Sequence, residues 1–315
     1  MCLILLGHFD QDLYLPLGVQ IPLQDLRKLQ KEPDLKTQGF TYVLREFPSD
    51  ALHLDAFSDG YTKLLERDAI ALVKELKKKA NLLARLRTNS HLAFCVSRGH
   101  RGKDPTTASE KPTRGIHSDM SSIGAKFIKE NFITTRLKAL NDAKANEFLE
   151  EMRQGNHVVI LNVWRPIQQV ERDPLAICDW TTVSDEDHLD FGHHPMEADN
   201  AIQAWSYNKK QSWYYLPQQQ PNEVFVFVQH DSAAPDGHGM NVPHASPVLL
   251  GTPEDTDHRL SYDFRIAAIV GPEFELVHNS KSKNKRKRES KVRSFFEITK
   301  SIFRNPMRRK NPDII

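Results

Sequence analysis

The spacing of apolar residues predicts two helical regions. Between residues 59 and 86, apolar side chains recur at helical spacing with Lys and Glu between them, which is typical of an amphipathic helix that packs on a sheet. Residues 123–153 show a second helical pattern, but Lys144 falls on its apolar face. We therefore expect one long helix over 59–86 and two shorter helices within 123–153.

Six segments rich in β-branched and aromatic residues are expected to form strands. Two of them are apolar throughout, which indicates strands buried on both faces. Several antiparallel strands separated by turns suit two facing sheets. The sequence thus predicts an α+β fold with a double-stranded β-helix (jelly roll) core and flanking helices. The expected strands are 39–44, 92–96, 157–164, 213–215, 223–228 and the segment after Arg259.

Three separated residues suggest a metal site. His117 and Asp119 stand two positions apart, and on an extended strand such side chains point to the same side. His244, far along the chain within a Pro-His-Ala run, would complete a set of two imidazoles and one carboxylate. That set is typical of non-haem iron(II) centres with open coordination positions. We predict that His117, Asp119 and His244 bind Fe(II).

A second pair of residues suggests a co-substrate site. Arg259 and Ser261 follow His244 in the chain and are again two positions apart. A guanidinium fork together with a hydroxyl is well suited to hold a distal carboxylate. In oxygenases with such a metal site, that carboxylate belongs to 2-oxoglutarate. We expect Arg259 and Ser261 to bind it.

Several short blocks, in order along the chain, resemble the fungal hydroxylase/desaturase family related to the bacterial cephamycin methoxylase component. The resemblance runs from about Phe40 to Val270. It implies a non-haem iron and 2-oxoglutarate-type oxygenase that hydroxylates or desaturates a small molecule, commonly in secondary metabolism, with dioxygen as the other co-substrate. The blocks are Asn162–Pro166, Asp173–Ala176, Cys178–Asp179, Tyr215–Pro217, Asp231–Ser232, Pro243–Ser246 and Arg259–Ser261.

Three further residues are candidates for substrate binding. Arg165 is placed to reach an acidic group, although a buried ion pair with Asp179 is the competing interpretation. Trp164 is a candidate for stacking in the pocket, although a Trp after a buried strand is more often part of the core. Tyr214 and Tyr215 alternate in direction, so only one can line the cavity; we assign Tyr215.

Other His clusters offer competing metal sites. One is an acidic loop with His188, Asp190, His193 and His194, and the other is a triad drawn wholly from residues 229–244, which include His230, Asp231, His238 and His244. Both lie in or beside loops, where His residues are usually solvated, so we rank them below the first set. A zinc hydrolase built on His117, Asp119 and His244 is a further alternative.

Composition limits the class of protein. The chain has 315 residues, 39% hydrophobic content and three Cys without a CxxC pair, which argues against a disulfide framework and a zinc ribbon. No segment approaches the ~20 apolar residues of a membrane span. We expect one catalytic domain over residues 1–278 in a reducing, cytoplasmic setting.

The final segment, 279–315, differs in charge from the rest. It contains thirteen Lys and Arg against three Asp and Glu, and its run Lys281–Arg293 is expected to stay solvated in a disordered or amphipathic tail. The tail is a candidate for contact with an anionic membrane surface, nucleic acid, a partner or the acidic body, or for nuclear import. The alternative function is therefore an inactive jelly-roll binding protein that uses this tail.

Overall fold

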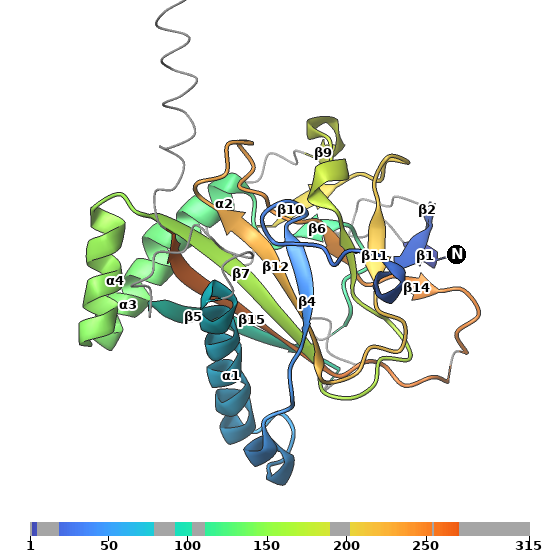
Figure 1. Cartoon of the computed structure of the whole chain (residues 1–315), viewed down its shortest axis with the longest axis horizontal. Helices are drawn as coiled ribbons and strands as arrows, with labels where there is room; N and C mark the ends of the chain where they lie inside the picture. The colour runs from blue at the N-terminus through green and yellow to red at the C-terminus, as the bar shows by residue number, and fades with distance from the viewer. Residues whose placement is uncertain are drawn as a thin grey trace, which may run out of the picture. The chain divides into compact units, whose positions relative to one another are not determined.

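The described part of the chain is built on two main β-sheets and a set of helices (Figure 1). The computed structural model describes residues 2–4, 19–78, 92–102, 111–189, 202–253 and 255–270. Three predicted features lie outside these ranges in part or in full: helical residues 79–86, the loop with Asp190, His193 and His194, and the basic segment 279–315. Within the described residues, no helix is both long and apolar enough to cross a membrane.

A five-stranded antiparallel sheet forms the centre of the fold. Its order is β4-β12-β7-β15-β5. The apolar strand predicted at 157–164 is β7, which is buried along almost its whole length because it lies in the middle of this sheet. The strands are β4 (Phe40–Leu44), β12 (Glu223–Asp231), β7 (His157–Pro166), β15 (Ser261–Val270) and β5 (Ala93–Arg101).

The helix α1 (Asp59–Lys78) covers one face of this sheet. Its apolar stripe, which includes Tyr61 and Leu65, is buried. On the same face, Thr62 Oγ1 lies 2.9 Å from the hydroxyl of Tyr262 on β15. The amphipathic pattern read from the sequence therefore does pack on a sheet.

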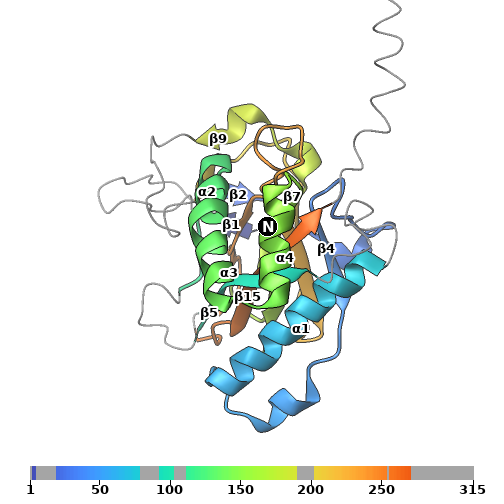
Figure 2. The ribbon, with the colours of Figure 1, turned by 90° about the vertical axis from the view of Figure 1, so that its left-hand side faces the viewer.

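The second helical region consists of α2 (Ser122–Phe127), a π-helical segment (Ile128–Ile133), α3 (Thr134–Leu140) and α4 (Ala143–Arg153). These helices bury apolar side chains against Val158 and Ile160 of β7 and against Ala267 and Ile269 of β15. Figure 2 shows them side by side. The predicted break is confirmed, and it lies at Asn141, which has a left-handed φ of 47°, and at Asp142, whose side chain caps α4.

A second sheet contains seven short strands in the order β3-β11-β8-β13-β6-β10-β9. Its pairings are antiparallel except for that of β3 with β11. The strands are β3 (Leu23–Asp25), β11 (Trp213–Tyr215), β8 (Ala176–Cys178), β13 (His244–Ala245), β6 (His117–Ser118), β10 (Gln203–Trp205) and β9 (His188–Leu189).

The remaining elements are small. A three-stranded sheet joins β14 (Val248–Leu249), β1 (Cys2–Ile4) and β2 (Val19–Ile21). Single-turn 3-10 helices occupy Leu26–Lys28, Ser49–His53, Trp180–Thr182 and Asp185–Asp187.

The face of the central sheet that is opposite α1 is divided into two parts. Along β7, Val158 and Ile160 contact the α2–α4 region, whereas Asn162 and Trp164, which point to the same side, line a cavity. The seven-stranded sheet lies over this second part, as shown by the contact of Phe227 on β12 with His244 on β13, whose rings are 4.9 Å apart. An α+β fold with two facing sheets and flanking helices is confirmed.

Candidate active site

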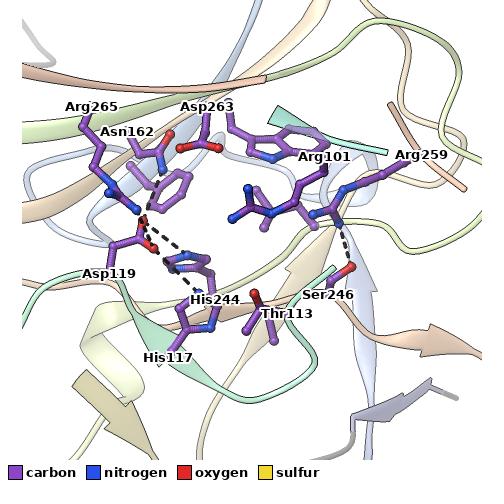
Figure 3. A pocket seen from close by; sticks show the side chains of 14 residues that line it. Arg101, Thr113, His117, Asp119, Asn162, His244, Ser246, Arg259, Asp263 and Arg265 are labelled. Atoms are coloured by element: carbon purple, nitrogen blue, oxygen red, sulfur yellow. Dashed lines mark hydrogen bonds and ion pairs between the residues drawn. The ribbon is translucent and has the colours of Figure 1, made fainter. Parts of the chain in front are cut away.

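A cavity lies between the two main sheets (Figure 3). Strands of both sheets contribute to its wall, so residues far apart in the sequence meet in it. Its lining consists of Arg101, Thr113, His117, Asp119, Asn162, Trp164, Leu175, Phe227, His244, Ala245, Ser246, Arg259, Asp263 and Arg265.

The two predicted His ligands are cross-strand neighbours. His117 on β6 is directly opposite His244 on β13, and their ring centroids are 4.4 Å apart. Nδ1 of His117 lies 2.9 Å from the carbonyl oxygen of Gly115, and Nδ1 of His244 lies 3.1 Å from that of Val242. Because a carbonyl only accepts a hydrogen bond, each Nδ1 carries the proton. Each Nε2 therefore keeps a free lone pair, as a metal ligand requires.

Both imidazoles are held in the neutral form. Burial and, to a smaller extent, the neighbouring His244 lower the pKa of His117 to about 4. Burial also lowers the pKa of His244, against the opposing effect of the Asp119 carboxylate. A neutral imidazole is the form that binds a metal ion.

Asp119 follows β6 directly and completes the cluster. Its Oδ1 lies 3.8 Å from Nε2 of His117, and its Oδ2 lies 3.7 Å from Nε2 of His244. The three ligand atoms all lie within 4.8 Å of one another, and no other group of three or more His, Cys, Asp or Glu in the described ranges is arranged in this way. The structure thus brings together the residues predicted as metal ligands.

The Asp119 carboxylate is held by side chains of the central sheet. Nη2 of Arg265 lies 3.1 Å from Oδ1, while Gln229 donates a short hydrogen bond to Oδ2 and the Asn162 amide lies 3.4 Å from the same oxygen. Burial raises the pKa of Asp119, but Arg265, the two imidazoles and Arg101 together outweigh it, so the pKa lies well below its usual range. The group is ionised at neutral pH and oriented from outside the cluster.

The donor set fits a metal ion of intermediate softness. Two neutral imidazole nitrogens and one carboxylate suit non-haem iron(II) with open coordination positions, and they also suit catalytic zinc. Because both Nδ1 atoms carry protons and the Asp119 carboxylate is held in place, the two Nε2 atoms and a carboxylate oxygen lie together as the available metal ligands.

Arg259 lies in the same cavity as a buried cation. Its Nη1 donates to the carbonyl oxygen of Asp173 at 2.5 Å and to Oγ of Ser246 at 2.6 Å, and its guanidinium lies over the Trp164 ring, 5.2 Å from the centroid. Its Nε has no hydrogen-bond partner, and no carboxylate of the described residues forms an ion pair with it. Since a buried unpaired charge is costly, this place favours an anionic ligand.

Ser261 is the first residue of β15, and Arg259 lies just before that strand rather than on it. Ser261 is buried, its hydroxyl has no partner within the described part of the chain, and it is not part of the cavity wall. The hydroxyl that contacts Arg259 belongs to Ser246. Ser246 is two residues after His244, the same spacing that separates His117 from Asp119, and this spacing was the signal that the sequence offered for it.

Arg165, which was predicted to bind substrate, does not line the cavity. Its side chain lies on the α1 side of β7, 3.3 Å from Asp68 in an ion pair, and its guanidinium lies over the Phe47 ring. Adjacent residues of a strand point to opposite faces, so Trp164 and Arg165 cannot both line the cavity. Trp164 does line it. Arg165 does form a buried ion pair, as the competing interpretation predicted, but its partner is Asp68 rather than Asp179.

Tyr215 does not line the cavity either. It lies on β11, which β8 separates from the ligand-bearing strand β13, and its role as a substrate contact stays a prediction. His230 and His238 do not converge on one point with a carboxylate in the described structure. Nε2 of His238 instead lies 3.4 Å from Oδ1 of Asp185, and His188 forms a hydrogen bond with the side chain of Gln203.

Comparisons with known proteins agree with this geometry. A family model described as "oxidoreductase/YMDC permease-like domain" matches residues 11–269. The hydroxylase/desaturase efuI of Hormonema carpetanum is 30% identical over 245 residues, which are 72% of this chain and 76% of efuI. The chain belongs to the hydroxylase/desaturase family.

Two other proteins similar to this chain have names that state a dependence on alpha-ketoglutarate. The alpha-ketoglutarate-dependent dioxygenase phiK, from a fungal species, is 30% identical over 162 residues, 50% of this chain and 53% of phiK. The chain thus matches about half the length of this relative. Among solved structures, the iron and alpha-ketoglutarate-dependent endoperoxidase NvfI has the same fold, with a TM-score of 0.58, 22% identity and coverage of 81% of this chain and 87% of that one.

Proposed function

We propose that this hydroxylase/desaturase family member is an iron(II)- and 2-oxoglutarate-dependent oxygenase that hydroxylates or desaturates a small molecule, in keeping with a role in secondary metabolism. The observation that carries the proposal is the position of Arg259 in the same cavity as His117, Asp119 and His244. Three ligand atoms within 4.8 Å and a buried cation that forms no ion pair with any described carboxylate fit a metal ion and an acidic co-substrate side by side. The names of efuI and phiK support the same chemistry.

In this proposal, Nε2 of His117, Nε2 of His244 and the carboxylate of Asp119 hold the metal. Bound iron(II) would supply the oxidising chemistry, using dioxygen and the conversion of 2-oxoglutarate to succinate and carbon dioxide. Arg265 and Gln229 keep Asp119 ionised and oriented toward the two imidazoles. Hydrogen bonds and ion pairs from surrounding residues orient the ligands of a metal ion.

Arg259 would hold the distal carboxylate of 2-oxoglutarate. The Asp173 carbonyl and the Ser246 hydroxyl accept hydrogen bonds from Nη1 of the guanidinium, which also lies over the Trp164 ring. The free Nε and the remaining N–H groups are left for the ligand. The Ser261 hydroxyl, which is buried nearby on β15 without a partner, is the second group that we assign to this carboxylate.

We further propose that the two facing sheets form a double-stranded β-helix, or jelly roll. The antiparallel pairing within the central sheet and the position of the cavity between the sheets support this topology. The likeness to NvfI supports the fold as well. Dioxygen and a small organic molecule are the expected partners, and the cytoplasmic location, the boundary at residue 278 and the role of the tail remain predictions.

The proposal is tested by 2-oxoglutarate turnover in air. Purified protein with iron(II), ascorbate and 2-oxoglutarate is expected to form succinate slowly even without substrate, and His244→Ala is expected to form none. The matched control is His53→Ala, because His53 lies in an exposed 3-10 helix outside the cavity. A folded, iron-loaded protein that forms no succinate and does not bind 2-oxoglutarate would refute the proposal. Hydrolytic activity supported by zinc would instead favour the zinc hydrolase.

A further inference from the structure

We propose that Arg101 is a second carboxylate-binding residue of the cavity, and that it holds a carboxylate which Arg259 does not. This inference rests on the proposed function and deepens it, because it assigns an acidic group to the organic substrate. The sequence had given no sign of a role for Arg101.

The end of β5 places Arg101 at the cavity. Arg101 is the last residue of β5 and pairs with Ser261 on β15. The next residue, Gly102, has a φ of +91° and lies against the backbone carbonyl of Arg259, where a side chain would clash. Glycine is therefore required at this close approach. It fixes the end of β5 beside Arg259, and the Arg101 guanidinium points toward the middle of the cavity (Figure 3).

Arg101 has no acidic partner among the residues that the structure describes. Its Nη1 donates a hydrogen bond to the neighbouring carbonyl oxygen of His100, at 2.9 Å. Asp263, the nearest candidate in Figure 3, is directly opposite Gly99 in the β5–β15 pair. A Cβ on Gly99 would lie only 2.5 Å from Oδ1 of Asp263, so this carboxylate is packed over the glycine. It forms no ion pair with Arg101.

The charge of the cavity is unbalanced. The lining includes three guanidinium groups and two carboxylates, and each imidazole donates its Nδ1 proton to a backbone carbonyl, which leaves Nε2 as an uncharged metal ligand. Iron(II) and the 2-oxoglutarate dianion carry equal and opposite charges, so together they leave one positive charge in excess. A singly charged acidic group on the substrate would balance it. The lining charges are Arg101, Arg259, Arg265, Asp119 and Asp263.

Two sources of the carboxylate are compatible with this position. One is the organic substrate, which the charge balance favours. The other is the second carboxylate of 2-oxoglutarate itself, since Arg101 lines the same cavity as His117 and Asp119. A fork of N–H donors suits either group. The experiment separates them.

The test uses the full chain loaded with Mn(II), which does not turn over but broadens the NMR signals of a nearby ligand. First, 2-oxoglutarate binding is measured by calorimetry for the wild type, Arg101→Met and Arg101→Lys. Next, acetate, butyrate and benzoate, with their neutral amides as controls, are titrated into the 2-oxoglutarate complex and their line broadening is recorded. Arg98→Met is the matched control, because Arg98 lies on the same strand but pairs with Glu66 of α1.

We expect the wild type to bind at least one monocarboxylate in preference to its amide. Arg101→Met should lose this binding by about tenfold or more, Arg101→Lys should lose less, and Arg98→Met should behave as the wild type. The affinity for 2-oxoglutarate should change less than about twofold. Melting temperatures of the variants establish that they are folded.

Three results would overturn the inference. If Arg101→Met binds both 2-oxoglutarate and the monocarboxylates as the wild type does, Arg101 binds no carboxylate. If it instead weakens 2-oxoglutarate by about tenfold, the carboxylate belongs to the co-substrate, and the assignment to the substrate is wrong. The same assignment fails if the wild type binds no monocarboxylate. Absence of 2-oxoglutarate binding in the wild type contradicts the proposed function itself, and this appears before any variant is compared.

Discussion

Gln229 donates its side-chain amide to Oδ2 of Asp119, and this hydrogen bond joins β12 of the central sheet to the end of β6 in the facing sheet. Gln229 is fully buried, so the bond is shielded from water. It fixes the carboxylate that lies between the two imidazoles. The cluster thus depends on a contact between the sheets as well as on the ligands themselves.

Replacement of Gln229 by Met should weaken metal binding. We expect the affinity for Mn(II) or Fe(II) to fall by roughly 10- to 100-fold, because loss of such outer contacts typically has this effect. Competition with a chelator measures the change. Gln219→Met is the control: Gln219 is equally buried but donates to the carbonyl of Glu223, away from the cavity. Equal metal affinity in Gln229→Met and the wild type would contradict the role of this hydrogen bond.

Arg259 should serve ligand binding rather than stability. Because it is buried without a counter-ion, Arg259→Met should leave the free energy of unfolding of the protein without 2-oxoglutarate unchanged or higher. The rise in melting temperature on adding 2-oxoglutarate to the Mn(II) form should disappear. Arg259→Lys should keep a small part of it, since Lys cannot form a fork. A large loss of stability with normal 2-oxoglutarate binding would reverse this assignment.

Asp173 anchors the segment that holds Arg259. Its carboxylate is fully buried, 2.5 Å from Nη2 of Arg114 and 2.6 Å from Nδ1 of His258, while its carbonyl accepts from Arg259. Burial raises the pKa of Asp173, but the hydrogen bond from His258 and the charge of Arg114 outweigh it, so the pKa lies below the ordinary 3.8. The ionised carboxylate therefore stabilises the folded state above that pH.

This stabilisation should be lost in acid. Because the folded-state pKa is depressed, the contribution is complete above about pH 4 and disappears as the pH falls through the folded-state value. Asp173→Asn should lower the free energy of unfolding at pH 7 by about 1–3 kcal/mol, and its curve should approach that of the wild type at low pH. Asn tolerates the left-handed φ of 58° at this position.

Chemical denaturation at several pH values measures the effect of Asp173→Asn. Asp257→Asn is the control, because Asp257 is exposed and directly precedes His258, which contacts the Asp173 carboxylate. Parallel pH curves for Asp173→Asn and the wild type would show that Asp173 is not the titrating group.

The sequence contained enough information for the elements with strong periodicity. The stripe of α1 and the apolar run of β7 were recognisable because burial on one or both faces imposes a local pattern. His117 and Asp119 were recognisable for a similar reason, since two residues two positions apart share a face. His244 entered the same site by its residue type and by family order.

Other parts of the site depend on which strands are neighbours. Gln229 reaches the Asp119 carboxylate, and Asp263 reaches the cavity, through the pairing of β12 and β15 with β7, which no local pattern specifies. Arg265 had a weak signal, because it continues the period of two that begins at Arg259. Arg165 was expected to share the cavity with Trp164 because the two residues belong to one sequence motif. Adjacent residues of a strand point to opposite faces, so Arg165 lies on the other side of the sheet.

The most direct test of the account is an anaerobic titration of the protein with iron(II) and 2-oxoglutarate, followed by visible absorption. The account predicts a weak charge-transfer band that requires both components, is absent in His244→Ala and decays when oxygen is admitted. Arg98→Met should give the band of the wild type. A folded, iron-loaded protein without this band at saturating 2-oxoglutarate would contradict the assignment of the cavity as an iron and 2-oxoglutarate site.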